Sequence, residues 1–469
     1  MNMPSRQTCC ARHRGTVLIA TILVVFLLAS LVIVFARQMR VEANVTAYRV
    51  AEVQTEAIVR GAVQYVIHQI DQNRINTASG GYEQAEQAVE IGDGLFWIIR
   101  PNFEQDDDLE HAYGIVGENS KVNINTATQA MLSKLPGMTE EMAAAIIDWR
   151  DPDATVSPNG AESEYYLLLD DPYESKNAPF ETLGELELVR GADADILYGE
   201  DANLSGVLDA TENDADDHDP PDNADGRLDR GIYDFITVYS RGQAESGGSA
   251  ASGDPDQQLV SVNTDDKNPL IELLSTVISD DRLSLVTANI IRRRQAYQSL
   301  IEFYITSGLQ AQEFDAIVDR LTTAPFRRPG LINVNTAPRE VLFTLQGLDE
   351  ADVEALIAAR QGARPDSLSW VVSPFDITRP QLRQKVLRFS RFITNRSWQY
   401  SADIVAVSGD GRAYKRYRVI VDAAQDTPRV IRMKDLSHMG WPLDPQILND
   451  LRSGVAPSQI SETLGTESL

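Results

Sequence analysis

The feature that most constrains this chain is an uncharged apolar run near its N-terminus, from Thr16 to Ala36. As a helix rising about 1.5 Å per residue, the run would extend roughly 30 Å, which is the thickness of the hydrocarbon core of a bilayer. Arg6, Arg12 and Arg14 precede it. The positive-inside rule therefore predicts a cytoplasmic N-terminus, with the rest of the chain on the other side of the membrane.

A secretory signal peptide would instead have an apolar core of about 7–15 residues and a small-residue cleavage site. The run here is longer, and the charged sequence Arg37-Gln38-Met39-Arg40 follows it. The sequence therefore favours a retained membrane-spanning helix, and a plain single-span anchor stays open as an alternative.

The helix is predicted to continue beyond the membrane to about residue 72. Apolar or small residues recur there at spacings of three and four, which marks one face of an amphipathic helix. Gly61 interrupts the pattern at a cost of about 1 kcal/mol, which a long helix tolerates. The residues of this stripe are Val41, Val45, Tyr48, Ala51, Thr55, Ile58, Ala62 and Tyr65.

The junction Arg14-Gly15-Thr16 resembles the class III leader of type IV pilins and type II secretion pseudopilins. Prepilin peptidase cuts such leaders after the glycine and leaves the apolar helix in the mature protein. The resemblance implies cleavage between Gly15 and Thr16 and N-methylation of Thr16. Pilins usually carry Glu at the fifth mature position, which is Ala20 in this chain, and one member of the family typically lacks that Glu.

Strand signals lie early and late in the chain. Gly92-Asp93-Gly94 and Gly409-Asp410-Gly411 each separate two β-prone runs, which predicts a hairpin at each place. Further strands are expected near 111–116 and 429–433. Together these segments predict one antiparallel sheet, with the middle of the chain as a large insertion.

The middle of the chain contains internal repeats. Residues 121–150 align without gaps to 331–360, and a weaker third copy covers about 262–294. Each copy is predicted to form a short strand, a helix capped by Thr126 or Thr336, a glycine turn and a second helix.

These units resemble the helix-hairpin-helix. DNA-binding versions carry two glycines whose backbone N–H groups hold a phosphate. Each hairpin here has only the first of these two glycines, Gly137 in one copy and Gly347 in the other, and acidic residues follow both. Since the chain also carries a net charge of −27, we expect packing modules that do not bind nucleic acid.

An acidic segment between the first and weaker copies fits the calcium-loop pattern D-x-[DN]-x-[DN]-G-x5-E. Calcium prefers several hard oxygen ligands, and Gly206 permits the sharp turn that brings them together. Asn223, Asp225 and Asp229 form a weaker second candidate, because Pro221 and Ile232 occupy its first and last positions. A solvated acidic linker is the alternative. The predicted ligands of the first loop are Asp201, Asn203, Ser205, Val207, Asp209 and Glu212.

Both cysteines, Cys9 and Cys10, precede the predicted cleavage point, so a mature chain would contain no disulfide and would depend on packing, with calcium as the expected cofactor. No P-loop, G-x-S-x-G or H-E-x-x-H motif occurs in the sequence. We therefore expect a protein that is not an enzyme.

Taken together, these features resemble the protein K family, the large minor pseudopilins of type II secretion systems. The resemblance implies an α+β fold with a pilin-type transmembrane helix, an antiparallel sheet and a large inserted α-helical domain with helix-hairpin-helix-like repeats. The expected parts are a leader (1–15), a stalk helix (16–72), the first part of the sheet (73–120), the inserted domain (121–385), the second part of the sheet (386–435) and a polar tail (436–469), which is either a weakly docked helix or disordered.

The resemblance also implies a role in protein export. The expected protein is a single-pass inner-membrane protein with a periplasmic bulk, located at the tip of the pseudopilus. Its expected partners are the minor pseudopilins I and J, the pseudopilus shaft, the inner-membrane assembly platform and prepilin peptidase. A minor pilin of a type IV pilus remains an alternative, as does a membrane-anchored DNA receptor, although the latter should show basic hairpins.

Overall fold

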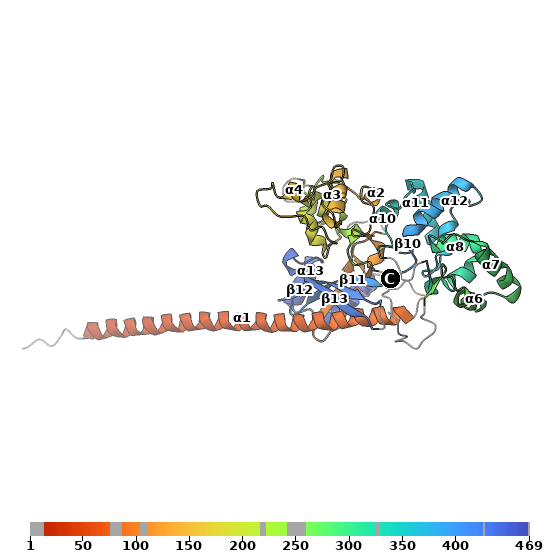
Figure 1. The fold of residues 1–469 in the computed structure, drawn as a ribbon. Helices are drawn as coiled ribbons and strands as arrows, with labels where there is room; N and C mark the ends of the chain where they lie inside the picture. The colour runs from red at the N-terminus through yellow and green to blue at the C-terminus, as the bar shows by residue number, and fades with distance from the viewer. Residues whose placement is uncertain are drawn as a thin grey trace, which may run out of the picture.

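The computed structural model describes residues 14–75, 87–103, 110–215, 222–241, 259–323, 329–424 and 427–467. Helix α1 (Arg14–Ile75) runs unbroken for 62 residues along one side of the molecule (Figure 1). This confirms that the apolar run continues into a long stalk. The apolar half is exposed along its described side chains and is long and apolar enough to cross a membrane.

The sheet combines strands from both ends of the chain, as predicted. Its strands follow the order β1-β2-β11-β12-β13, and every pair along this path is antiparallel. Both predicted hairpins are present, at the β1–β2 and β11–β12 connections. The strands are β1 (Val89–Ile91), β2 (Gly94–Arg100), β11 (Gln399–Val407), β12 (Tyr414–Asp422) and β13 (Arg429–Asp435).

The segment predicted as one strand near 111–116 instead forms two short strands. β3 (Ala112–Tyr113) pairs with β2, and β4 (Val116–Gly117) pairs with β11. Gly114 lies between them with a φ of +142°, which residues with a side chain rarely adopt. The chain turns there from one neighbouring strand to the other.

One face of the sheet packs against the C-terminal half of α1. The predicted apolar stripe supplies Ile58 and Ala62 to this core. The two hairpins meet closely beside the helix, since a Cβ on Gly94 would lie 2.5 Å from the carbonyl oxygen of Val407. Thr55 is fully buried, and its hydroxyl donates to the carbonyl of Ala413 at 3.2 Å. This bond connects α1 to the residue that precedes β12.

The opposite face of the sheet is partly covered by the C-terminal segment. The sequence predicts a polar tail that is either a weakly docked helix or disordered. The structure agrees with the helical alternative and shows two helices, α13 (Pro445–Ser453) and α14 (Pro457–Glu467). Leu448, Leu451 and Ile460 are buried against the sheet residues Leu95, Trp97, Ile99, Val405 and Val407. The scattered apolar residues of the tail therefore form a docking face.

The inserted domain contains three units, which correspond to the three predicted copies. Each unit opens with a two-residue strand and closes with a second one that pairs parallel to it. The last pair ends at Thr394, beyond the predicted end of the insert at 385. The pairs are β5 (Val122–Asn123) with β6 (Ile236–Thr237), β7 (Val260–Ser261) with β8 (Leu321–Thr322), and β9 (Ile332–Asn333) with β10 (Ile393–Thr394).

Helices fill the space between the paired strands of each unit. The first unit contains α2 (Gln129–Leu132), α3 (Glu140–Arg150), α4 (Ser163–Tyr166), η2 (Leu183–Leu188), α5 (Ala194–Tyr198), η3 (Ala210–Glu212) and η4 (Ile232–Phe235). The second contains α6 (Asn268–Ser275), α7 (Asp280–Arg292), α8 (Leu300–Ser307), α9 (Ala311–Asp315) and η6 (Val318–Arg320). The third contains α10 (Arg339–Phe343), α11 (Glu350–Arg360), η7 (Ser369–Val372), α12 (Pro380–Phe389) and η8 (Ser390–Phe392). Two further 3-10 turns, η1 (Glu118–Ser120) and η9 (Ser437–Met439), flank the insert and the tail.

The predicted helix caps at Thr126 and Thr336 are wrong. The carbonyl of Asn123 accepts from the backbone N–H groups of Thr126 and Ala127, so the chain first makes a turn and the helix begins later. Thr128 caps α2 by accepting from the N–H of Met131, and Pro338 stands at the matching position before α10. The second helices begin as expected after the glycine turn, capped by Thr139 and Asp349.

One asparagine side chain closes each unit in the same way. Asn125 donates to the carbonyl of Phe180 at 2.9 Å and accepts from its N–H at 2.7 Å. Asn263 makes the same pair of bonds to Tyr297, at 2.9 and 2.8 Å. Asn335 donates to the carbonyl of Ser367 at 3.1 Å. The repeated asparagines thus join the opening strand of each unit to the start of its later helix.

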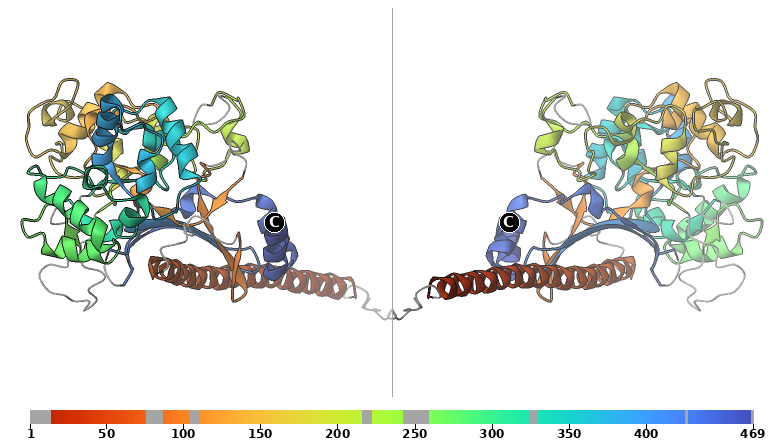
Figure 2. Two further views of the ribbon diagram at one scale, coloured as in Figure 1. Left: turned by 90° about the vertical axis from the view of Figure 1, so that its right-hand side faces the viewer. Right: turned by 90° about the vertical axis from the view of Figure 1, so that its left-hand side faces the viewer.

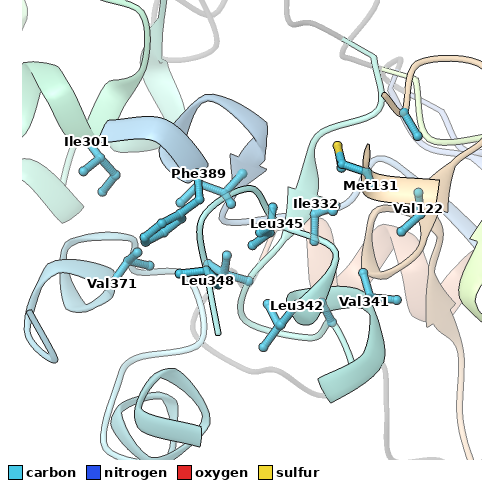
Figure 3. Packing of buried hydrophobic residues seen from close by; sticks show 14 of the residues in the cluster. Val122, Met131, Ile301, Ile332, Val341, Leu342, Leu345, Leu348, Val371 and Phe389 are labelled. Atoms are coloured by element: carbon cyan, nitrogen blue, oxygen red, sulfur yellow. The ribbon is translucent and has the colours of Figure 1, made fainter. Parts of the chain in front are cut away.

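A continuous hydrophobic core runs through all three units. Figure 3 shows Val122 and Met131 of the first unit, Ile301 of the second, and Ile332 and Phe389 of the third within one cluster. Figure 2 shows the helices of the insert stacked on the side of the sheet that faces away from α1. The inserted domain is therefore a single packed body above the sheet.

Candidate functional site

The predicted calcium loop lies between α5 and η3 in the first unit. Asp201 is buried, with 2% of its surface exposed, and both of its carboxylate oxygens accept backbone N–H groups, from Ser205 at 2.8 Å and from Gly206 at 2.9 Å. Gly206 has a φ of +76°, as the predicted sharp turn requires. The loop therefore turns around its first residue, as calcium loops of this pattern do.

The other predicted ligands of the first loop converge on the same turn. The amide of Asn203 donates to Asp209 at 2.6 Å, and the hydroxyl of Ser205 donates to the carbonyl of Val207 at 3.0 Å. Glu212 is buried, with 2% exposed, and accepts from the N–H of Asp209 at 3.1 Å. All six predicted residues thus belong to one hydrogen-bonded loop.

Two carboxylates in this loop have raised pKa values. Burial, followed by repulsion from Asp234, raises the pKa of Asp201 to about 7. Burial, followed by repulsion from Asp201, raises the pKa of Glu212 to about 8. A bound cation would relieve both effects, because it neutralises carboxylates that burial has removed from water.

The second candidate loop is joined to the first. Gly199 and Arg230 form an antiparallel bridge, in which the N–H of Glu200 donates to the carbonyl of Asp229 at 2.9 Å. Within this loop the amide of Asn223 donates to Asp229 at 3.0 Å, and Asp225 accepts from the N–H of Arg227 at 2.9 Å. The two acidic loops therefore lie side by side.

Glu200 is a residue of this site that the sequence analysis missed. It is buried, with 6% exposed, and its carboxylate accepts from the N–H groups of Asn223 at 3.3 Å and Asp229 at 2.8 Å. The loop pattern could not indicate it, because Glu200 precedes the first loop and reaches the second across the bridge. Glu200 thus places a carboxylate near the second loop, whose own twelfth position is the apolar residue Ile232.

The donor set fits a hard cation better than a transition metal. Among the described residues, no three His, Cys, Asp or Glu side chains converge on one point. The first loop instead mixes carboxylates with amide, hydroxyl and backbone oxygens, which is the ligand chemistry of calcium. The buried, mutually repelling Asp201 and Glu212 are the observation that favours a cation there over a solvated linker.

A buried arginine connects the first loop to the sheet. Arg416 of β12 has no exposed surface and donates to the carbonyl of Asn203 at 2.7 Å. Its guanidinium also binds both oxygens of Asp403 on β11, at 3.0 and 2.9 Å, and Arg418 binds Asp403 at 2.9 Å. Burial alone would raise the pKa of Asp403, but the two guanidiniums outweigh it and hold the pKa below its usual value. The loop and the sheet thus share one ion-pair network.

The hairpins of the first and third units face each other. Lys134, next to the first hairpin, donates to three carbonyls around the third unit's turn, those of Phe343 at 2.8 Å, Leu345 at 3.3 Å and Leu348 at 3.1 Å. Its ammonium also lies 4.6 Å from the centre of the Phe343 ring. The polar groups of this hairpin turn are therefore used inside the protein, which agrees with a packing module.

The predicted processing residues lie at the start of α1. Gly15, Thr16 and Ala20 all fall within this helix, and residues 1–13 of the predicted leader lie outside the described residues. No structural feature described here tests cleavage after Gly15, which stays a prediction.

Comparison with known proteins finds a similarity over part of the chain. The family model for the type II secretion system (T2SS), protein K, matches residues 114–198, which include β4, the first hairpin and α5. Type II secretion system protein K from Pectobacterium carotovorum subsp. carotovorum is 40% identical over 57 residues, which cover 12% of this chain and 17% of that protein.

A solved structure is also similar in outline. It is the GspK-GspI-GspJ complex from the type 2 secretion system of enterotoxigenic Escherichia coli, matched with a TM-score of 0.39 and 10% identity over 81% of this chain and 95% of that chain. The alignment with the curated relative spans under a fifth of that relative's length. The family model and this relative show that part of the chain is similar to protein K of type II secretion systems.

Proposed function

We propose that this protein is a minor pseudopilin that starts and caps the periplasmic pseudopilus, and that its role is structural rather than catalytic. The observation that carries the proposal is the position of the inserted domain. The helical units lie over the sheet and the C-terminal end of α1, while the apolar half of α1 projects from the other end (Figure 1). In a filament of stacked stalk helices, such a domain would occupy the space of the next subunit.

Ala20 supports the same position. In a pilin filament, the carboxylate at the fifth mature position of an incoming subunit neutralises the N-terminal amine of the subunit above it. A tip subunit has no subunit above it, and an unpaired carboxylate in the membrane would cost about 2.5–3.5 kcal/mol or more. Alanine at this position therefore suits the first subunit of a filament.

Partners and location are inferred from the similarity to protein K of type II secretion systems. The protein is proposed to assemble with the minor pseudopilins I and J, to rest on the pseudopilus shaft and to contact the inner-membrane assembly platform. Prepilin peptidase would cleave it after Gly15, leaving a methylated Thr16 and one membrane span with the bulk of the chain in the periplasm.

Calcium is proposed as a structural cofactor of the two acidic loops. Asp201, Asn203, Ser205, Asp209 and Glu212, with the carbonyl of Val207, would hold one ion. Asn223, Asp225 and Asp229 would hold a weaker second ion with help from Glu200. When bound, calcium supplies positive charge and oxygen coordination that hold both loops in one conformation.

The proposal is tested by locating the protein on assembled filaments. Site-specific crosslinking should find the wild-type chain only at filament ends, and Ala20→Glu should reduce filament initiation or allow incorporation below the tip. Ala20→Ser serves as a control that adds a polar group without a charge. Wild-type protein distributed along the shaft would refute the tip position.

A further inference from the structure

The edge strand β13 is exposed along its whole length. All seven of its residues are exposed, and among the described residues it pairs only with β12. The core beneath α1 contains side chains from β2, β11 and β12, and no described residue of β13 belongs to it. The last strand of the sheet therefore extends past the helix that covers its neighbours.

The face of β13 on the α1 side carries the apolar side chains Val430 and Met433, with Asp435 opposite Tyr417 at its end. Met433 and Val430 pair with Val419 and Val421 of β12, which lie in the core beneath α1. Met433 and Val430 themselves are 42% and 38% exposed. A strand added outside β13 would extend this apolar face and cover both side chains.

The opposite face of β13 is basic and borders a groove. Arg432 and Lys434 line a cavity of about 220 Å³ between the sheet and the first unit. Lys121 and Arg418 also line it, but Lys121 pairs with Glu118 and Arg418 pairs with Asp403. Among the described residues, Arg432 and Lys434 have no ion-pair partner, although the chain carries a net charge of −27.

We infer that β13 is a docking edge for an extended segment of a partner protein in which acidic and apolar side chains alternate. Backbone hydrogen bonds to an edge strand provide affinity, and the alternating side chains provide specificity. Carboxylates on one side of the added strand would face Arg432 and Lys434. Apolar side chains on its other side would cover Val430 and Met433. This inference goes beyond the proposed tip position and does not depend on it.

The competing explanation is protection of the edge. Charged side chains and irregular pairing commonly prevent edge strands from associating, and a register shift occurs opposite β13 at Ile420/Val421. Protection alone, however, does not require apolar side chains on one face and unpaired cations on the other. A basic edge would repel a second copy of itself and still accept an acidic strand.

The test uses the full-length protein in detergent and a fluorescent ten-residue peptide that alternates Glu and Val. A second peptide has the same sequence with N-methyl groups on alternate backbone amides, and a third alternates Lys and Val. Fluorescence anisotropy should show binding of the first peptide, with at least tenfold weaker binding of the other two. Hydrogen exchange should slow at residues 429–435 when the first peptide is present.

Matched variants separate the edge from general charge attraction. Arg432→Glu combined with Lys434→Glu should weaken binding at least tenfold. Arg383→Glu combined with Arg388→Glu makes the same charge change on exposed residues of α12 and should leave binding unchanged. Equal binding of the N-methylated peptide, absence of binding, or absence of protection at 429–435 in the wild-type protein would each overturn the inference.

Discussion

The stalk-and-sheet region and the inserted domain are built by different means. In the sheet, β11 and β12 pair along nine residues each around a short turn. In the insert, the strands are two residues long, and each pair joins residues far apart in the sequence, such as Val122 and Ile236. The sheet is thus held by local hairpins, whereas the insert depends on side chains and distant contacts to close each unit.

This difference indicates which groups stabilise each region. Hairpins provide continuous backbone hydrogen bonds, so single side chains matter less there. In the insert, individual polar groups such as Asn125 and Lys134 join segments that no regular sheet connects. The predictions that follow test this contrast, beginning with Arg416, a residue of the sheet that also contacts the insert.

Arg416→Met should have the largest effect, because it leaves Asp403 buried with fewer partners and frees the carbonyl of Asn203. Breaking a buried ion pair by removing one member costs about 3–5 kcal/mol, with the lower end expected here because Arg418 still binds Asp403. Urea unfolding measures the loss. Arg412→Met, at an exposed pair with Asp410, is the matched control and should cost under about 1 kcal/mol.

If the network couples the two regions, Arg416→Met should also speed proteolysis within residues 201–212. Adding Asp403→Asn to Arg416→Met should lower the stability further, because the carboxylate that still pairs with Arg418 is then removed. An unchanged rate of cleavage in this loop would show that the sheet does not hold it.

Calcium should have the second largest effect, and it should act on the insert. Binding to the folded state alone adds about 2.7 kcal/mol at a hundredfold excess over Kd. Millimolar calcium should raise the melting temperature and protect residues 195–235 from protease, while magnesium should do so far less. Glu212→Gln should remove most of the shift, and Glu187→Gln, on the surface of η2, should retain it. Calorimetry that detects no binding at millimolar calcium would make the segment a solvated linker.

Lys134→Met should cost about 1–3 kcal/mol, because three carbonyls near the third unit's hairpin lose a half-buried donor. The matched control is Lys176→Met, whose ammonium is also half-buried but pairs with Glu185 inside one unit and should contribute under about 1 kcal/mol. Hydrogen exchange should increase at residues 343–349 in the first variant and not in the second. A loss confined to the sheet would contradict the proposed contact between hairpins.

His111 should give the smallest effect, and it should act on the sheet and tail. Burial lowers the pKa of His111, whose Nε2 lies 2.8 Å from the carbonyl of Pro442. The unfolded chain therefore binds a proton at His111 more readily than the folded protein does. The contribution of neutral His111 to the free energy of unfolding is present above pH ~6.5 and is lost as pH falls through the lower folded pKa. Melting temperatures between pH 7 and 5 should fall less in His111→Gln than in wild type. His68→Gln, on α1, is the control and should follow wild type.

The same contrast explains what the sequence could predict. Alternating apolar residues around Gly-Asp-Gly turns are local signals, so the hairpins and the long α1 were accessible to pattern reasoning. The closing strands β6, β8 and β10 have only two residues each, and no periodicity can reveal so short an element. The residues of the first loop could be grouped from the sequence because one turn fixes their spacing, and their role as calcium ligands stays a prediction. Glu200 could not be grouped with them, because it reaches the second loop through a bridge between distant residues.

The tail and the helix caps show two different limits of pattern reasoning. The sequence left open whether the tail is a docked helix or disordered, because its apolar residues are few, and the face of the sheet decides this by giving Leu448, Leu451 and Ile460 a surface to cover. The predicted cap at Thr126 is wrong for a local reason, because the turn at Asn123 delays the helix and Thr128 becomes its cap.

The pairing of β4 with β11 has a consequence for the history of this architecture. The chain leaves the sheet at Gly117 and returns at Tyr400, and these two residues are partners in the ladder. Both ends of the inserted domain are therefore attached at neighbouring points, so the sheet would need only a short turn to close without it. A pilin-like ancestor could gain or lose the whole domain through one insertion or deletion, without changing a strand of its sheet.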